Sequence, residues 1–270
     1  MELKHKTVLI TGASRGIGAD MARQFASKGC KVILVARSSE ELKALAIDIG
    51  GYAYVVDLLS YEQIQNLARE IDLEFGPIDI LVNNAGIDST GDFLATDTQV
   101  LRDTVSLNLG ATIEMCRHFL PAMVRRGSGH VVNVTSVAGV AAFSGMAVYA
   151  ATKAGISQFT AALRAELKGC NIQTTLVEIS AVSTTMAVNV MDYPPTGAAA
   201  NRLGRFGLLK FLKPERVAFW TVRAVEKGRR HVRLPYRAWV LYAIAEVPRR
   251  MTEWLVIGVQ SRPESYVKER

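Results

Sequence analysis

The chain has 270 residues, of which 49% are hydrophobic and 21% charged, and its formal net charge is +7. This size and balance are typical of a folded globular protein and exclude a disordered chain. Its three cysteines, Cys30, Cys116 and Cys170, lack metal-ligand spacing, so we expect free thiols and no metal site. The first residues lead into an apolar segment without the pattern of a secretory signal, so we expect a cytoplasmic protein.

Short β-branched segments alternate with longer amphipathic segments along the chain. The predicted strands are Thr7–Ile10, Lys31–Ala36, Tyr52–Val56, Ile78–Val82, His130–Thr135, Ile172–Val177 and His231–Leu234. The predicted helices are Gly18–Lys28, Glu40–Ile49, Tyr61–Phe75, Leu101–Arg126 and Val148–Lys168. This alternation predicts βαβ units with right-handed crossovers. Because several strands are almost wholly apolar, we expect a parallel sheet that is covered on both faces.

A glycine-rich turn, Thr11-Gly12-Ala13-Ser14-Arg15-Gly16-Ile17-Gly18, joins the first predicted strand to the first helix. Glycines permit a tight turn and let the backbone approach a pyrophosphate, which the free N–H groups of the helix N-terminus then bind. A glycine cluster alone is also found in plain structural turns. Its position here favours a dinucleotide site, for which the candidate residues are Gly12, Ser14, Arg15, Gly16, Ile17 and Gly18.

The end of the second strand indicates which dinucleotide is bound. An acidic residue there binds the ribose 2′-hydroxyl of NAD, whereas an arginine accommodates the 2′-phosphate of NADP. This chain has Arg37-Ser38 at that point, and Arg15 lies in the glycine turn. Two guanidinium groups are able to hold a phosphate dianion through charge-assisted hydrogen bonds. The alternative is that both arginines are solvated surface residues; we expect NADP(H) rather than NAD(H).

Tyr149 and Lys153 are four residues apart on a predicted helix, so they share one face. A phenol has a pKa of about 10, and a nearby ammonium lowers it, which makes the pair a candidate general acid/base. This spacing is common by chance. Ser136 ends the fifth strand, on the side where doubly wound sheets bind ligands, and its hydroxyl could hold a substrate oxygen. A helix cap is the alternative role for this serine.

Together these segments resemble the short-chain dehydrogenase/reductase family, in its classical NADP-preferring branch, over about residues 6–185. The pieces that match in order and spacing are Thr11–Gly18, Asp57, Asn83-Asn84-Ala85-Gly86, Asn108, Ser136, and Tyr149 with Lys153. The resemblance implies an α/β fold, a doubly wound seven-stranded parallel sheet (Rossmann fold) with strand order 3-2-1-4-5-6-7. It also suggests a homodimer or homotetramer formed through the helices Leu101–Arg126 and Val148–Lys168.

The resemblance implies a role for each matching catalytic residue. Tyr149 would be the acid/base, and Ser136 would hold the substrate oxygen. Lys153 would bind the nicotinamide ribose and lower the pKa of the tyrosine. Asn108 would hold a water that extends the proton relay to solvent.

Cofactor contacts follow from the same resemblance. Asp57 and Leu58 would contact the adenine, and Asn84, Ala85 and Gly86 would line the cofactor, although asparagines here are otherwise ordinary turn residues. After the sixth strand the family commonly has Pro-Gly and then a threonine near the nicotinamide amide. Here Ile179-Ser180 replaces the Pro-Gly pair, and Val182 and Thr184 are the candidate contacts.

Residues 186–213, the lid segment, stand where the family has its mobile substrate lid. They are rich in Met, Gly, Ala and Pro. The predicted lining residues are Met186, Met191, Tyr193 and Phe206, so we expect an apolar substrate.

Residues 235–270 form a basic, apolar extension beyond the last predicted strand, which we expect to be helical. Residues 202–270 hold 16 of the 32 basic residues but only 6 of the 25 acidic ones. The two apolar runs at 238–245 and 254–257 are shorter than the ~20 residues needed to span a bilayer. Aromatics beside arginines at 235–259 fit a peripheral membrane contact, and an arm that packs on the lid or on a partner subunit is the alternative. No motif indicates nucleic-acid binding.

The sequence therefore predicts one Rossmann-type catalytic domain at 1–234, followed by the extension. We expect an NADP(H)-dependent oxidoreductase of lipid metabolism that interconverts a hydrophobic alcohol and its ketone or aldehyde. The alternative is a sensor or scaffold that binds NADP(H) without turnover.

Overall fold

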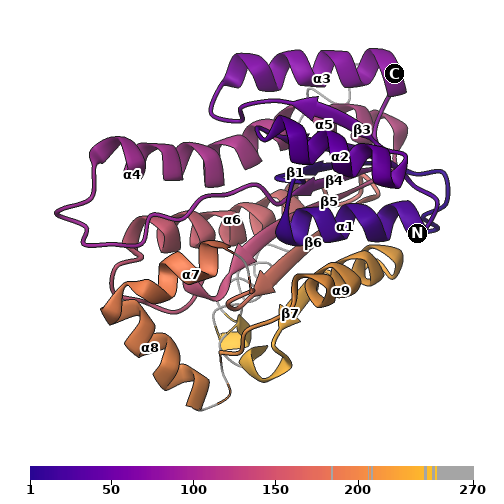
Figure 1. Cartoon of the computed structure of the whole chain (residues 1–270). Helices are drawn as coiled ribbons and strands as arrows, with labels where there is room; N and C mark the ends of the chain where they lie inside the picture. The colour runs from indigo at the N-terminus through magenta and orange to yellow at the C-terminus, as the bar shows by residue number, and fades with distance from the viewer. Residues whose placement is uncertain (184, 206, 208, 240–241, 245–246, 248–270) are drawn as a thin grey trace.

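The computed structural model describes residues 1–183, 185–205, 207, 209–239, 242–244 and 247. The predicted contacts of Thr184 and Phe206, and most of the extension, lie outside these residues. At the centre is a seven-stranded parallel sheet with the order β3-β2-β1-β4-β5-β6-β7 (Figure 1). The predicted α/β fold and strand order are confirmed.

The elements alternate along the chain as the sequence indicates. The strands are β1 (Thr7–Thr11), β2 (Lys31–Ala36), β3 (Tyr52–Val55), β4 (Ile80–Asn83), β5 (Gly129–Ser136), β6 (Ile172–Ile179) and β7 (His231–Leu234). The helices are α1 (Gly16–Ser27), α2 (Ser39–Ile49), α3 (Tyr61–Phe75), α4 (Thr98–Val105), α5 (Ala111–Arg126), α6 (Ala147–Glu166), α7 (Thr185–Asp192), α8 (Pro194–Arg205) and α9 (Pro214–Glu226).

Helices cover both faces of the sheet, because side chains alternate between its faces along each strand. In β1, Val8 and Ile10 are buried in one apolar layer with side chains of α1, α2 and α9. Leu9 is buried in the opposite layer with side chains of α3, α5 and α6. Two apolar layers explain why the strands lack the polar alternation of a half-exposed sheet.

The predicted helix Leu101–Arg126 is helical throughout, but it starts earlier, at Thr98, and contains a π turn that the sequence pattern did not predict. A π-helical turn, Ser106–Gly110, separates α4 from α5. Within this turn, Asn108 bonds to both backbone groups of Ile87, a residue in the loop after β4. Single π turns inside helices are frequent at functional sites.

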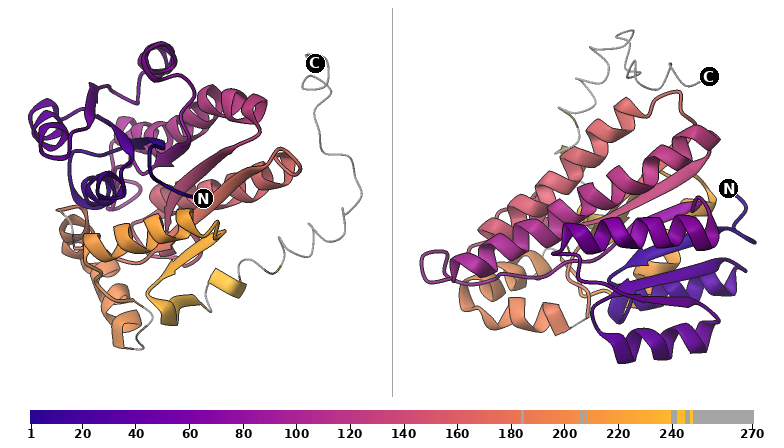
Figure 2. Two further views of the ribbon diagram at one scale, coloured as in Figure 1. Left: turned by 90° about the vertical axis from the view of Figure 1, so that its right-hand side faces the viewer. Right: turned by 90° about the horizontal axis from the view of Figure 1, so that it is seen from above.

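The lid segment contains α7 and α8, two helices that the sequence pattern did not predict. They follow β6 and lie beyond its carboxyl end, while α9 packs beside α1 and β7 (Figure 2). A 3₁₀ turn, Tyr236–Ala238, begins the extension. Within the described ranges, no helix combines the length and hydropathy needed to cross a bilayer.

Candidate active site

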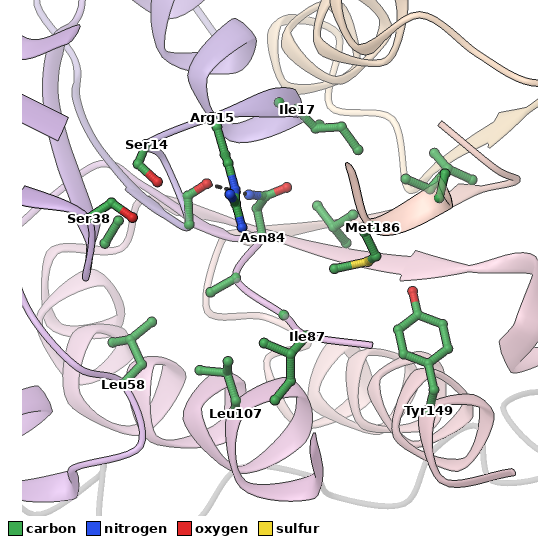
Figure 3. Close-up of a pocket in the computed structure, with 18 of the residues that line it drawn as sticks. Ser14, Arg15, Ile17, Ser38, Leu58, Asn84, Ile87, Leu107, Tyr149 and Met186 are labelled. Carbon is green, nitrogen blue, oxygen red and sulfur yellow. Dashed lines mark hydrogen bonds between the residues drawn. The ribbon is translucent and has the colours of Figure 1, made fainter. Parts of the chain in front are cut away.

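A cleft of about 1010 Å³ opens at the carboxyl ends of the first five strands (Figure 3). Fourteen of the predicted cofactor-site residues line it: Gly12, Ser14, Arg15, Gly16, Ile17, Arg37, Ser38, Asp57, Leu58, Asn84, Ala85, Gly86, Tyr149 and Lys153. Ser14 and Ser38 lie at one end of the view, and Tyr149 and Met186 lie at the other. The topology therefore brings together motifs that are spread over 140 residues of sequence.

The glycine turn fits closely against the loop after β4. Gly12 and Gly16 have φ values of +64° and +57°, which side chains rarely adopt. A Cβ on Gly12 would lie 2.8 Å from the Cα of Ala85, and one on Gly18 would overlap the carbonyl oxygen of Gly12. Gly18 does not line the cleft; it lets α1 pack against the turn.

Asn84 joins the glycine turn to the loop after β4. Its Nδ2 donates to the carbonyl oxygens of Thr11 and Gly12 at 3.0 and 3.2 Å. In return, Thr11 Oγ1 accepts from the backbone N–H groups of Asn84 and Ala85 at 3.0 and 3.1 Å. Four hydrogen bonds therefore fix the floor of the cleft. The side chain of Asn84 thus both lines the cleft and holds the glycine turn in place.

The end of the cleft at β2 and β3 is positively charged. Arg15 and Arg37 both line it and are exposed, and Figure 3 shows Arg15 reaching into the cavity from the glycine turn. Asp57 uses its carboxylate locally, because Oδ1 accepts from the N–H of Leu59 at 3.1 Å. Leu58 is buried and supplies an apolar wall.

Tyr149, Ser136 and Lys153 meet where β5 ends and α6 begins. Ser136 is hydrogen-bonded to Tyr149, and Lys153 Nζ lies 5.5 Å from the centroid of the tyrosine ring. Lys153 is 5% exposed, and its Nζ donates to the carbonyl oxygen of Val134 at 3.3 Å. The tyrosine hydroxyl points across the cavity toward Met186 (Figure 3).

Burial dominates the titration of this pair. It raises the pKa of Tyr149 to about 12; the hydrogen bond with Ser136 acts in the opposite direction, and the negative charge of Asp88 adds to the rise. Burial also lowers the pKa of Lys153 to about 8. The net pKa of Tyr149 therefore lies above its ordinary value, and the predicted lowering by the amine stays a prediction. At neutral pH the phenol keeps its proton and the amine is charged, which is the state of a general acid.

Asn108 lies behind the cleft and does not line it. It is 0% exposed. Its Oδ1 accepts from the N–H of Ile87 at 2.8 Å, and its Nδ2 donates to the Ile87 carbonyl at 3.0 Å and to Thr152 Oγ1 at 3.2 Å. Thr152 Oγ1 donates in turn to the carbonyl of Tyr149. The side chain thus connects the π turn to the first turns of α6, and its predicted water contact stays a prediction.

A second cavity, of about 130 Å³, adjoins the cleft and shares six lining residues with it: Ile17, Tyr149, Ile179, Met186, Ala187 and Met191. Its walls are mainly apolar. The other predicted residues that line it are Ser136 and Val182, and the sequence reading missed Val137, Phe143, Met146, Val190 and Leu209. Phe143 and Met146 stand between Ser136 and Tyr149 in the chain, a position that could have revealed them.

One predicted lining residue lies elsewhere, and one side chain of the extension packs near the small cavity. Tyr193 packs on Gly145 instead of lining either cavity, since a Cβ on that glycine would overlap the tyrosine ring. The extension supplies Tyr242, which is 1% exposed and packs with Val137, Phe143 and other walls of the small cavity. Tyr242 of the extension therefore packs beside the small cavity.

The comparisons with known proteins agree with this geometry. Residues 6–194 match the family model of the short chain dehydrogenases. The chain is 32% identical over 252 residues to the probable oxidoreductase EphD of Mycobacterium tuberculosis, a match that covers 89% of this chain and 43% of EphD. The chain thus spans less than half the length of that relative.

Solved structures show the same fold. A short-chain dehydrogenase from Streptomyces avermitilis superposes with a TM-score of 0.78 and 29% identity, covering 95% of this chain and 98% of that one. An actinorhodin polyketide ketoreductase solved with NADPH has a TM-score of 0.77 and 27% identity, covering 85% and 95%. Since the family match includes β1 to β6 and the cleft that they form, the chain belongs to the short-chain dehydrogenase/reductase family of oxidoreductases.

Proposed function

We propose that the protein is an NADP(H)-dependent oxidoreductase that interconverts a hydrophobic alcohol and its ketone or aldehyde. One observation carries the proposal. The protonated hydroxyl of Tyr149, bonded to Ser136 and close to Lys153, stands where a dinucleotide-sized cleft meets an apolar cavity. An alcohol or ketone carbon and its polar oxygen would both find suitable surroundings there.

The residues of the cleft fit a dinucleotide, which would supply or accept the hydride. The N-terminus of α1 would hold the pyrophosphate, and Lys153 would hold the ribose next to the nicotinamide. Gly86 lets the loop after β4 pack closely on two side chains of the site, because a Cβ would lie 3.0 Å from Asn108 Oδ1 and 3.5 Å from Lys153 Nζ. Arg15 and Arg37 support NADP(H), and the actinorhodin ketoreductase with NADPH is consistent with that choice.

The proposed chemistry uses the protonation state of the site. In the direction of reduction, Ser136 would hold the carbonyl oxygen while Tyr149 donates its proton to that oxygen as negative charge develops. The ammonium of Lys153 would then stabilise the phenolate that remains. In the direction of oxidation the same phenolate accepts the proton of the alcohol.

The mainly apolar walls of the small cavity support a hydrophobic substrate. Phe143, Met146, Met186 and Val190 offer no charge to a ligand. Burial of apolar surface would then supply most of the binding free energy, and Ser136 and Tyr149 would fix the orientation.

Replacing Tyr149 tests the proposal. NADPH absorbance is followed with a panel of lipophilic ketones, and Tyr149→Phe is expected to lower kcat by about 10²–10⁴-fold with little change in NADPH affinity. The matched control is Tyr193→Phe, which should keep its turnover because Tyr193 packs on Gly145. Full turnover by Tyr149→Phe would refute the acid/base role. NADPH binding without oxidation across the whole panel would favour the sensor instead.

A further inference from the structure

The end of the lid segment and the start of the extension form a surface without acidic residues. Segments 201–214 and 235–239 contain five Lys and Arg residues and no Asp or Glu. The side chain of Arg237 lies against the lid segment, since a Cβ on Gly207 would be 3.2 Å from its Nη1. Figure 1 and the left view of Figure 2 place the end of α8 and the start of the extension on one side of the molecule.

Aromatic side chains accompany the exposed cations of this surface. Phe211, Tyr236 and Trp239 are 46%, 79% and 46% exposed. We call this surface the basic face and define it by Arg202, Arg205, Lys210, Phe211, Tyr236, Arg237 and Trp239, all of which are exposed. Single exposed aromatic side chains are ordinary, but here three of them lie beside four cations, so the surface is both positively charged and partly apolar.

The inner side of segment 201–214 contributes to the wall of the small cavity through Leu209. Leu203 and Leu209 pack in the apolar cluster of Phe143 and Met146. The carbonyl of Lys210 accepts a hydrogen bond from Ser180 Oγ at 2.8 Å, which ties this wall to the end of β6. A molecule docked on the basic face would therefore lie one layer of side chains away from the cavity.

We propose that the basic face docks on an anionic lipid bilayer and lies in its interface without crossing it. Cations beside Trp and Tyr match a negatively charged headgroup region above an apolar layer. Ile244 and Val247 extend the apolar part, at 66% and 52% exposure, and uncharged aliphatic side chains have no partner on a nucleic-acid backbone. Delivery of an apolar substrate from the membrane to the cavity is a consequence that rests on the proposed function.

The test is co-sedimentation of the full chain with vesicles of phosphatidylcholine alone and of phosphatidylcholine with about one third phosphatidylglycerol. The chain is expected to bind the anionic vesicles at least tenfold more strongly and to be released by high salt. The triple variant Arg202→Glu, Arg205→Glu, Lys210→Glu should lose at least tenfold in partitioning. The double variant Tyr236→Ser, Trp239→Ser should lose binding at equal charge.

A matched control reverses three exposed cations on the far helices, Lys43→Glu, Arg69→Glu and Arg125→Glu, and should bind as the unaltered chain does. The inference would be overturned if the chain failed to bind the anionic vesicles or bound both kinds of vesicle equally. It would also be overturned if the control lost as much binding as the triple variant, or if the chain bound a DNA duplex more tightly than the vesicles. Ketone reduction without vesicles is measured in parallel. Retained turnover with no vesicle binding would reject the membrane surface alone, and vesicle binding without turnover would reject the proposed function alone.

Discussion

Replacing Lys153 with methionine is expected to stabilise the protein while removing its turnover. The amine is 5% exposed, its nearest hydrogen-bond acceptor is the Val134 carbonyl at 3.3 Å, and burial lowers its pKa from 10.5 to about 8. At about 1.4 kcal/mol per pKa unit, this drop means that the buried charge costs about 3 kcal/mol of folding free energy. Methionine has a similar length and carries no charge, so it should recover most of that cost.

The pH dependence identifies the cause. The pKa of Lys153 is lower in the folded chain, so the unfolded chain binds the proton more tightly. The folded state therefore loses stability as pH falls from about 10.5 to about 8, where the amine takes up its proton. In urea titrations at pH 7, the free energy of unfolding of Lys153→Met should therefore be about 3 kcal/mol higher than that of the unaltered chain. This difference should vanish toward pH 10.5. Lys43→Met, at an exposed site of α2, should change the free energy of unfolding by less than about 0.5 kcal/mol. A Lys153→Met protein no more stable than its parent at pH 7 would refute the reasoning.

Three further outcomes follow from single sites. Burial lowers the pKa of His130 to about 4. The free energy of unfolding should therefore fall by about 3 kcal/mol as pH drops from about 6.5 to 4, and in the same urea titrations it should fall less for His130→Gln. Gly12→Ala should raise the Kd for NADPH at least tenfold in calorimetry, whereas Gly127→Ala, with a φ of +68° but open surroundings, should cost about 1 kcal/mol and leave the Kd unchanged. Arg37→Asp should lower the ratio of kcat/KM for NADPH over NADH at least tenfold; an unchanged ratio would assign the arginine to the surface.

The sheet could be predicted because its sequence signal is local. Val8, Leu9 and Ile10 form an apolar run, and β1 buries them on both faces. The strand ends depend instead on neighbours: β4 extends to Asn83, which is in register with Asn133 of β5, and no local pattern marks that residue as a strand end. The same holds for the π turn, since Asn108 is held by Ile87, 21 residues earlier in the chain.

The cofactor side of the site was also predictable, whereas the substrate side was only partly so. Glycines and polar residues of the cofactor cleft follow strand ends, so their place is fixed once the strand order is known. Tyr242 reaches the wall of the small cavity from the extension, about 100 residues beyond Val137 and Phe143. Apolar composition alone does not indicate which of the many apolar residues face that cavity, and the prediction of an apolar substrate rested on lid residues of which Tyr193 lies elsewhere.

The replacement of Pro-Gly by Ile179-Ser180 illustrates how a local departure changes the connections of a loop. A proline at position 179 would have no N–H and would restrict the end of β6, whereas Ile179 continues the strand in register with Ser136 and Leu234. Ser180 then donates its N–H to the Leu234 carbonyl at 2.9 Å and its hydroxyl to the Lys210 carbonyl at 2.8 Å. Sheet pairing, and not a proline ring, therefore sets the direction in which the chain leaves β6. The strand that carries Ser136, the edge strand β7 and the returning lid segment are therefore joined at that one point.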